Sequence, residues 1–163
     1  MPDYKDTVTH IDELLQQTFG DYFKVYYKGL PSQTPPEAAY PCVIVYKQTA
    51  SYSAGASQSD DMTEAIMIHL MSNRMDSMGS DNTIDTVMRE LEEKVEGREP
   101  ATAEFKQGTL MHALRYNLTL DASIIDSTAA ITYSSTPRRD AAFIAEADIQ
   151  LNITARVTVL NRH

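Results

Sequence analysis

The sequence is poor in the residues that most recognisable active sites need. Cysteine occurs once in 163 residues, which excludes an internal disulfide and a cluster of cysteine metal ligands. Only six glycines are present, and no phosphate-binding loop of the GxxxxGK[ST] or GxGxxG type occurs. HExxH and GxSxG are absent as well. We therefore expect no enzyme activity, no bound cofactor and no metal.

Basic residues are also scarce. The chain has 14 Lys and Arg against 23 Asp and Glu, which gives a formal net charge of −9. A protein that grips nucleic acid needs clustered basic side chains, and here the only adjacent basic pair is Arg138-Arg139. No apolar run approaches the ~20 residues of a membrane-spanning helix, and the start lacks the apolar region of a secretory signal. We expect neither nucleic-acid binding nor a membrane association.

Two stretches show the spacing of amphipathic helices. In the first, residues 7–19, Gly20 stands where a helix C-terminal glycine belongs and Asp6, Thr7 or Thr9 could cap the start. The second, residues 84–96, ends at Gly97. The two apolar stripes consist of Val8, Ile11, Leu14, Leu15 and Phe19, and of Ile84, Val87, Met88, Leu91 and Val95.

The remaining patterned segments read as strands. Residues 42–54 and 62–71 form a long hairpin with a polar break, GASQSDD, between them. Further strands are expected at 21–29, 109–125, 128–134 and 142–160. The prediction is a single α+β domain over 1–163: a largely antiparallel sheet with a long β-hairpin, packed by two helices, and an extra hairpin at about 121–147.

Cys42 raises the question of a thiol nucleophile. It opens the apolar run CVIVY, and free cysteine is among the most buried residue types. A catalytic thiolate needs a base and an accessible, electropositive setting. The candidate bases are His69 and His112, which lie in strands expected near the Cys42 strand. We interpret Cys42 as a core residue.

The order of these elements resembles that of bacteriophage tail terminator or tail completion proteins. The resemblance lies in the helix HIDELLQQTFG, the strand of P-x-V-x-V-Y type at Pro41–Tyr46, the return strand from Ala65 to Leu70, and the helix that follows it. It covers roughly residues 7–120 and rests on element order and strand patterns.

That resemblance implies a virion protein, assembled in the host cytoplasm, that forms a ring, expected to be hexameric. The ring would cap the head-proximal end of a tail tube, stop tube polymerisation and contact the neck or connector protein, while DNA passes through without specific binding. The expected subunit or partner interface residues are Tyr52, Asp60, Asp61, Arg138, Arg139 and Asp140. The alternatives are another head–tail connector or stopper protein, a small-ligand-binding α+β domain, or an enzyme using Cys42.

Overall fold

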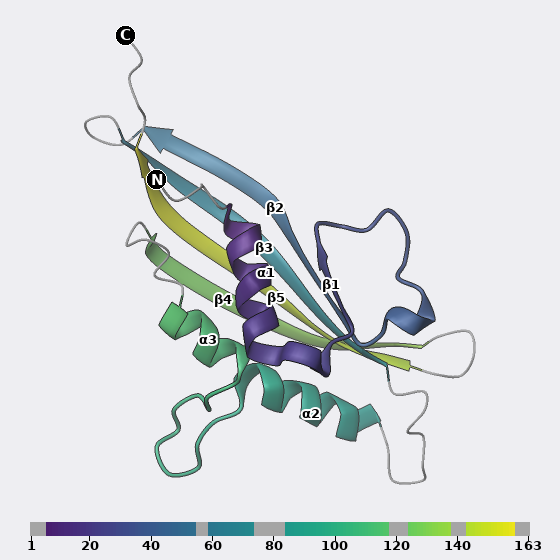
Figure 1. The fold of residues 1–163 in the computed structure, drawn as a ribbon. Coiled ribbons are helices and arrows are strands. Elements are labelled where there is room, and N and C mark those ends of the chain that lie inside the picture. The colour runs from purple at the N-terminus through teal and green to yellow at the C-terminus, as the bar shows by residue number, and fades with distance from the viewer. Residues whose placement is uncertain (1–5, 55–58, 74–83, 118–123, 138–142, 159–163) are drawn as a thin grey trace.

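The computed structural model describes residues 6–54, 59–73, 84–117, 124–137 and 143–158. Within these ranges the chain forms three α-helices and five strands, so the fold is α+β as the sequence predicts (Figure 1). In chain order the elements are α1 (Thr7–Phe19), the 3-10 helix η1 (Gly20–Tyr22), β1 (Val25–Lys28), the 3-10 helix η2 (Glu37–Ala39), β2 (Cys42–Ala54), β3 (Ser59–Asn73), α2 (Ile84–Glu96), α3 (Leu110–Asn117), β4 (Ile124–Pro137) and β5 (Phe143–Thr158).

The five strands form one sheet in the order β1-β2-β3-β5-β4. Only the β1–β2 pair is parallel, and the other three neighbouring pairs are antiparallel. The predicted long hairpin is confirmed by β2 and β3, where Cys42 pairs with Met71 at one end and Ala54 pairs with Asp60 at the other. The return strand is longer than the expected 62–71, because β3 begins at Ser59 and ends at Asn73.

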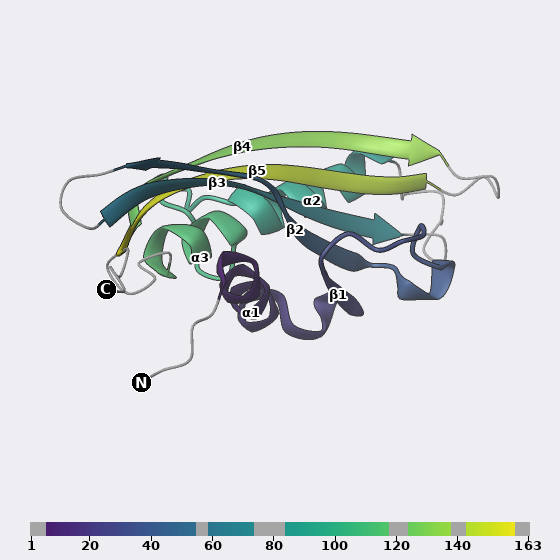
Figure 2. The same ribbon diagram turned by 90° about the horizontal axis from the view of Figure 1, so that it is seen from above.

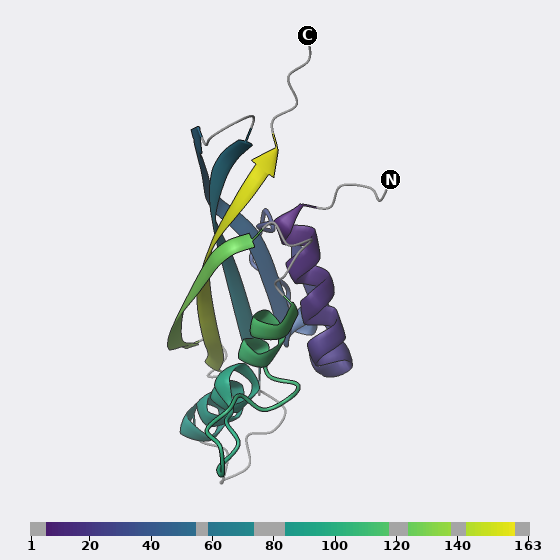
Figure 3. The same ribbon diagram turned by 90° about the vertical axis from the view of Figure 1, so that its left-hand side faces the viewer.

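The three α-helices pack on one face of the sheet, and in the described part of the chain no α-helix lies against the other face (Figures 2 and 3). Strand side chains alternate between the two faces, so Ile66, Ile68 and Leu70 of β3 join the helices in the core. Other core members are Ile11, Leu15 and Phe19 of α1, Val87, Leu91 and Val95 of α2, Leu110 and Leu114 of α3, and Ala147, Ile149, Leu151 and Ile153 of β5. We call the opposite side of the sheet the open face.

Local signals explain why α1 begins and ends where it does. The Asp6 carboxylate accepts a hydrogen bond from the Thr9 backbone N–H at 2.7 Å, which caps the first turn. Gly20 follows the last turn with a φ of +52°, a conformation that glycine adopts without the steric cost of a Cβ. Both features confirm the sequence prediction for this helix.

The strand expected at 109–125 is wrong, because residues 110–117 form α3. The hydroxyl of Thr109 accepts a hydrogen bond from the His112 backbone N–H at 3.2 Å and so caps the first turn of the helix. Leu110, Ala113 and Leu114 then lie on one side of α3 and are buried. These three residues have the spacing of one helix face, and residues 118–123 of the expected strand lie outside the described residues.

The segment expected to carry an extra hairpin, 121–147, contains β4 and the first part of β5. These strands pair with each other, and β5 also pairs with β3 from Asn73 opposite Ile144 to Ser59 opposite Thr158. The segment is therefore continuous with the main sheet. None of the described helices has the length and apolar character needed to cross a membrane.

Candidate functional site

Cys42 lies at the start of β2 and is fully buried. Burial, together with a smaller effect of the negative charge of Glu146, raises the pKa of its thiol to about 12. His69 shares the open face with Cys42, whereas His112 belongs to α3, on the helix side of the sheet. The structure therefore does not bring the cysteine and the two histidines together, and a thiol so firmly protonated is a poor nucleophile.

The predicted interface residues fall into three groups. Tyr52 of β2 is 62% exposed, which makes it one of the two large hydrophobic side chains most open to solvent in the described part of the chain. Asp60 and Asp61 lie within β3 instead of in a turn, and the Asp61 carboxylate accepts a hydrogen bond from Arg156 Nε at 3.3 Å. Arg138, Arg139 and Asp140 lie outside the described residues.

The sheet has two edges that other described strands leave unpaired. At one edge, β1 pairs with β2 only from Cys42 to Val45, so β2 has no described neighbour on that side from Tyr46 to Ala54. At the opposite edge, β4 is the last strand of the sheet over its 14 residues. Backbone donors and acceptors along such edges are available to pair with a strand of another chain.

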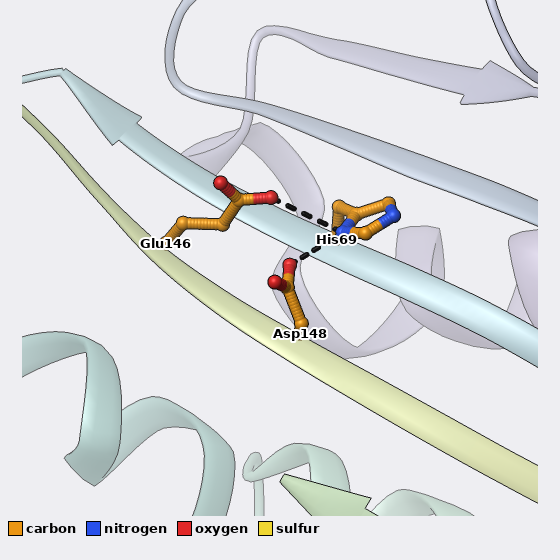
Figure 4. A group of neighbouring side chains, drawn as sticks. All are labelled: His69, Glu146 and Asp148. Carbon is orange, nitrogen blue, oxygen red and sulfur yellow. Dashed lines mark hydrogen bonds and ion pairs between the residues drawn. The ribbon is translucent and has the colours of Figure 1, made fainter. Parts of the chain in front are cut away.

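A compact polar cluster lies on the open face where β3 and β5 pair. His69 of β3 is directly opposite Asp148 of β5 in the sheet register, and Glu146 is two residues away on the same face of β5. Both carboxylates point at the Nδ1 atom of His69 (Figure 4). Glu146 Oε1 lies 3.1 Å from Nδ1, and Asp148 Oδ1 also contacts it.

The two carboxylates control the protonation of the imidazole. The hydrogen bond with Glu146 and the contact with Asp148 raise the pKa of His69 to about 8, against the opposing effect of burial. In turn, His69 holds the pKa of Glu146 below its usual value. The pKa of Asp148 is raised, first by burial and then by the neighbouring Glu146. The neighbouring Glu146 and Asp148 thus favour the protonated imidazole at neutral pH.

Tyr46 of β2 fixes the other side of the imidazole. Its ring stacks on the His69 ring with centroids 5.6 Å apart and an interplanar angle of 24°. Its hydroxyl oxygen lies 3.4 Å from His69 Nε2, where it can accept a hydrogen bond from that N–H. The ring orientation is thus set by contacts on both nitrogens.

His69, Glu146 and Asp148 are the described residues that could hold a metal ion, since one ligand atom from each lies within 4.8 Å of the others. The sequence analysis did not identify this cluster. The alternation of β5 places Glu146 and Asp148 on one face, which is a local signal. Their meeting with His69, 79 residues before Asp148 in the chain, depends on the pairing of β3 with a strand that is not next in sequence.

No protein-family model matches the chain. A search of curated proteins likewise finds no significant match.

Proposed function

We propose that this chain is a structural virion protein that assembles with copies of itself into a closed ring of six at the head-proximal end of a bacteriophage tail tube. In this role it ends tube polymerisation and joins the tail to the neck or connector protein. The proposal rests on the resemblance in element order described above and on one structural observation. That observation is the pair of unpaired sheet edges on opposite sides of the molecule.

Two different free edges favour head-to-tail assembly. If β4 of one copy pairs with the exposed half of β2 of the next, each contact joins two unlike surfaces, and a repeated contact of this kind closes into a ring when the rotation between copies allows it. Natural proteins usually protect free edges with Lys, Pro or a covering segment. β4 carries no lysine and has its only proline, Pro137, at its end, so little in its sequence discourages pairing.

The charge of the chain supports passage of DNA without binding. A net charge of −9 gives little attraction for phosphate groups, because affinity for the DNA backbone comes from clustered basic side chains. On the open face, Arg156 is engaged with Asp61 and His69 with two carboxylates. The positive charges of Arg156 and His69 are therefore already paired with carboxylates and attract a phosphate group only weakly.

The contact between edges can be tested with engineered cysteines. Ser51 on the free half of β2 and Thr128 on β4 are both exposed, and the natural Cys42 is buried. Within one chain these two edges are separated by β3 and β5, which amounts to about 14 Å at ~4.8 Å per strand spacing. A disulfide needs Cα atoms within about 7 Å. Any disulfide between Ser51→Cys and Thr128→Cys must therefore join two chains.

We expect the double variant to give a ladder of cross-linked species that ends at one closed size under mild oxidation. Each single variant should give dimers at most, because it supplies only one side of the contact. The register between copies decides which residues of the two edges meet. A second double variant therefore combines Ser51→Cys with Thr132→Cys, an exposed position further along β4. If neither double variant forms more cross-linked protein than the single variants do, edge-to-edge assembly is refuted.

A further inference from the structure

The cluster of His69, Glu146 and Asp148 carries an inference that does not depend on ring assembly. Its side chains are only 19%, 22% and 28% exposed, respectively. The two carboxylates place negative charge beside the imidazole in this half-buried site. Among the described residues, no lysine or arginine forms an ion pair with either carboxylate. Partly buried charge without full compensation is costly.

A divalent cation would balance this charge completely. With the imidazole neutral, two carboxylates and one doubly charged ion sum to zero. The ion would take the place of the proton on Nδ1, the nitrogen at which both carboxylates are aimed (Figure 4).

The separation between His69 Nδ1 and Glu146 Oε1 is close to that expected between two ligands of a small transition-metal ion. Ligand atoms bound to Zn²⁺ at 2.0–2.2 Å in a tetrahedron lie roughly 3.4 Å apart. Nδ1 of His69 and Oε1 of Glu146 are 3.1 Å apart, and the three ligand atoms lie within 4.8 Å of one another. Small rotations of the two carboxylate side chains are enough to receive the ion, because the backbone is fixed by the central β3–β5 pairing.

The contact between His69 and Tyr46 also suits a metal-binding histidine. A histidine that binds a metal through one ring nitrogen usually donates its other N–H to a fixed acceptor, which sets the tautomer. Here metal on Nδ1 leaves the proton on Nε2, and the Tyr46 hydroxyl oxygen lies 3.4 Å from that atom. The stacked Tyr46 ring holds the imidazole plane in place.

We propose that His69, Glu146 and Asp148 form a binding site for a divalent transition-metal cation such as Zn²⁺, with water as its fourth ligand. The imidazole ligand favours Zn²⁺ over Mg²⁺ and Ca²⁺, which prefer oxygen ligands alone. None of the described α-helices packs on this face, and the three side chains are partly exposed, so the ion would reach the site from solvent.

Titration calorimetry of the full, metal-free chain with ZnCl₂ tests the site. We expect one Zn²⁺ per chain in the unchanged protein. His69→Ala and Asp148→Asn each remove a ligand and should each weaken Zn²⁺ binding by more than about 100-fold. Changing a residue that only hydrogen-bonds to a ligand typically costs ~10–100-fold in affinity. Tyr46→Phe keeps the stacked ring and should weaken binding about 10-fold. His10→Ala is the matched control, since it removes a histidine on α1 and should leave binding unchanged.

The proposal would be overturned if the unchanged protein did not bind Zn²⁺, or if His69→Ala bound Zn²⁺ as tightly as the unchanged protein. Binding of Ca²⁺ as tight as that of Zn²⁺ would also overturn it, because it would indicate general attraction to acidic side chains. Circular dichroism establishes that each variant folds. If His69→Ala does not fold, the ¹⁵N resonances of the unchanged protein decide: the Nδ1 signal of His69 must shift on addition of Zn²⁺, and an unshifted signal excludes ligation.

Discussion

Asp12 is a carboxylate in a place that disfavours its charge. It lies on the buried side of α1 with 9% of the residue exposed. Its Oδ2 atom accepts a hydrogen bond from Gln16 Nε2 at 2.8 Å. Its Oδ1 atom is buried and has no hydrogen-bond partner in the part of the chain that the structure describes. Burial raises the pKa of Asp12 above its ordinary value of 3.8.

Replacing Asp12 by alanine should therefore stabilise the protein near pH 7. Removing the unsatisfied oxygen gains about 1–3 kcal/mol, and losing the bond to Gln16 costs about 1 kcal/mol. The helix preference of alanine over aspartate adds roughly 0.5 kcal/mol. The expected net gain in the free energy of unfolding is about 1 kcal/mol.

The pH dependence distinguishes this cause from helix propensity alone. Because the folded-state pKa of Asp12 is raised, the group favours the folded state most below its unfolded pKa, and this contribution is lost as pH rises through the folded pKa. The gain from Asp12→Ala should thus be largest near pH 7, should shrink as the pH falls through the raised folded-state pKa, and should be smallest below about pH 3.8, the ordinary value.

Urea unfolding followed by circular dichroism at pH 7 and pH 3 measures both effects, with each variant compared with the unchanged protein at the same pH. Gln17→Ala is the control, because Gln17 is exposed on the same helix and its replacement changes helix propensity without removing a charge. A loss of stability in Asp12→Ala at pH 7, or a gain of equal size at both pH values, would refute the reasoning.

Three further predictions concern other parts of the fold. Cys42 in the folded protein should react with Ellman's reagent near pH 8 about 1000-fold more slowly than in the unfolded chain. The reason is that a thiol pKa of about 12, against the usual ~8.5, leaves far less thiolate. Comparable rates in the folded and unfolded chains would contradict the burial of Cys42. Lys47→Met should cost about 2 kcal/mol, because it leaves the carboxylate of Glu64, a residue only 2% exposed, without its cation at 3.1 Å. The double variant with Glu64→Leu should recover most of that loss in urea unfolding, and failure to recover would argue against a charge effect. Leu114→Ala should cost about 3 kcal/mol because α3 buries this side chain in the core, and a cost below about 1 kcal/mol would contradict the placement of α3.

The parts of the fold set by nearby residues could be predicted from the sequence. The cap at Asp6, the glycine at position 20 and the apolar stripe of α1 are all local features, and so is the pattern of the β2–β3 hairpin. The segment at 109–125 was assigned wrongly because two periodicities compete there. The cap at Thr109 and the burial of Leu110 and Leu114 against the sheet decide in favour of a helix.

The polar cluster could not be predicted, because it depends on sheet order. A sequence shows that Glu146 and Asp148 share a face of their strand, yet it does not show that β5 inserts between β3 and β4. The register that places Asp148 opposite His69 follows from burying Ala147 and Ile149 against the helices on the other side. Such tertiary constraints act between residues far apart in the chain.

Self-association is the central claim, and the solution mass tests it most directly. Light scattering across a wide range of protein concentrations, with negative-stain images of the same samples, measures both the mass and the shape of the particles. The account predicts rings with a mass six times that of the 18.2 kDa chain. A mass of 18.2 kDa at every concentration, with no rings in the images, would contradict it.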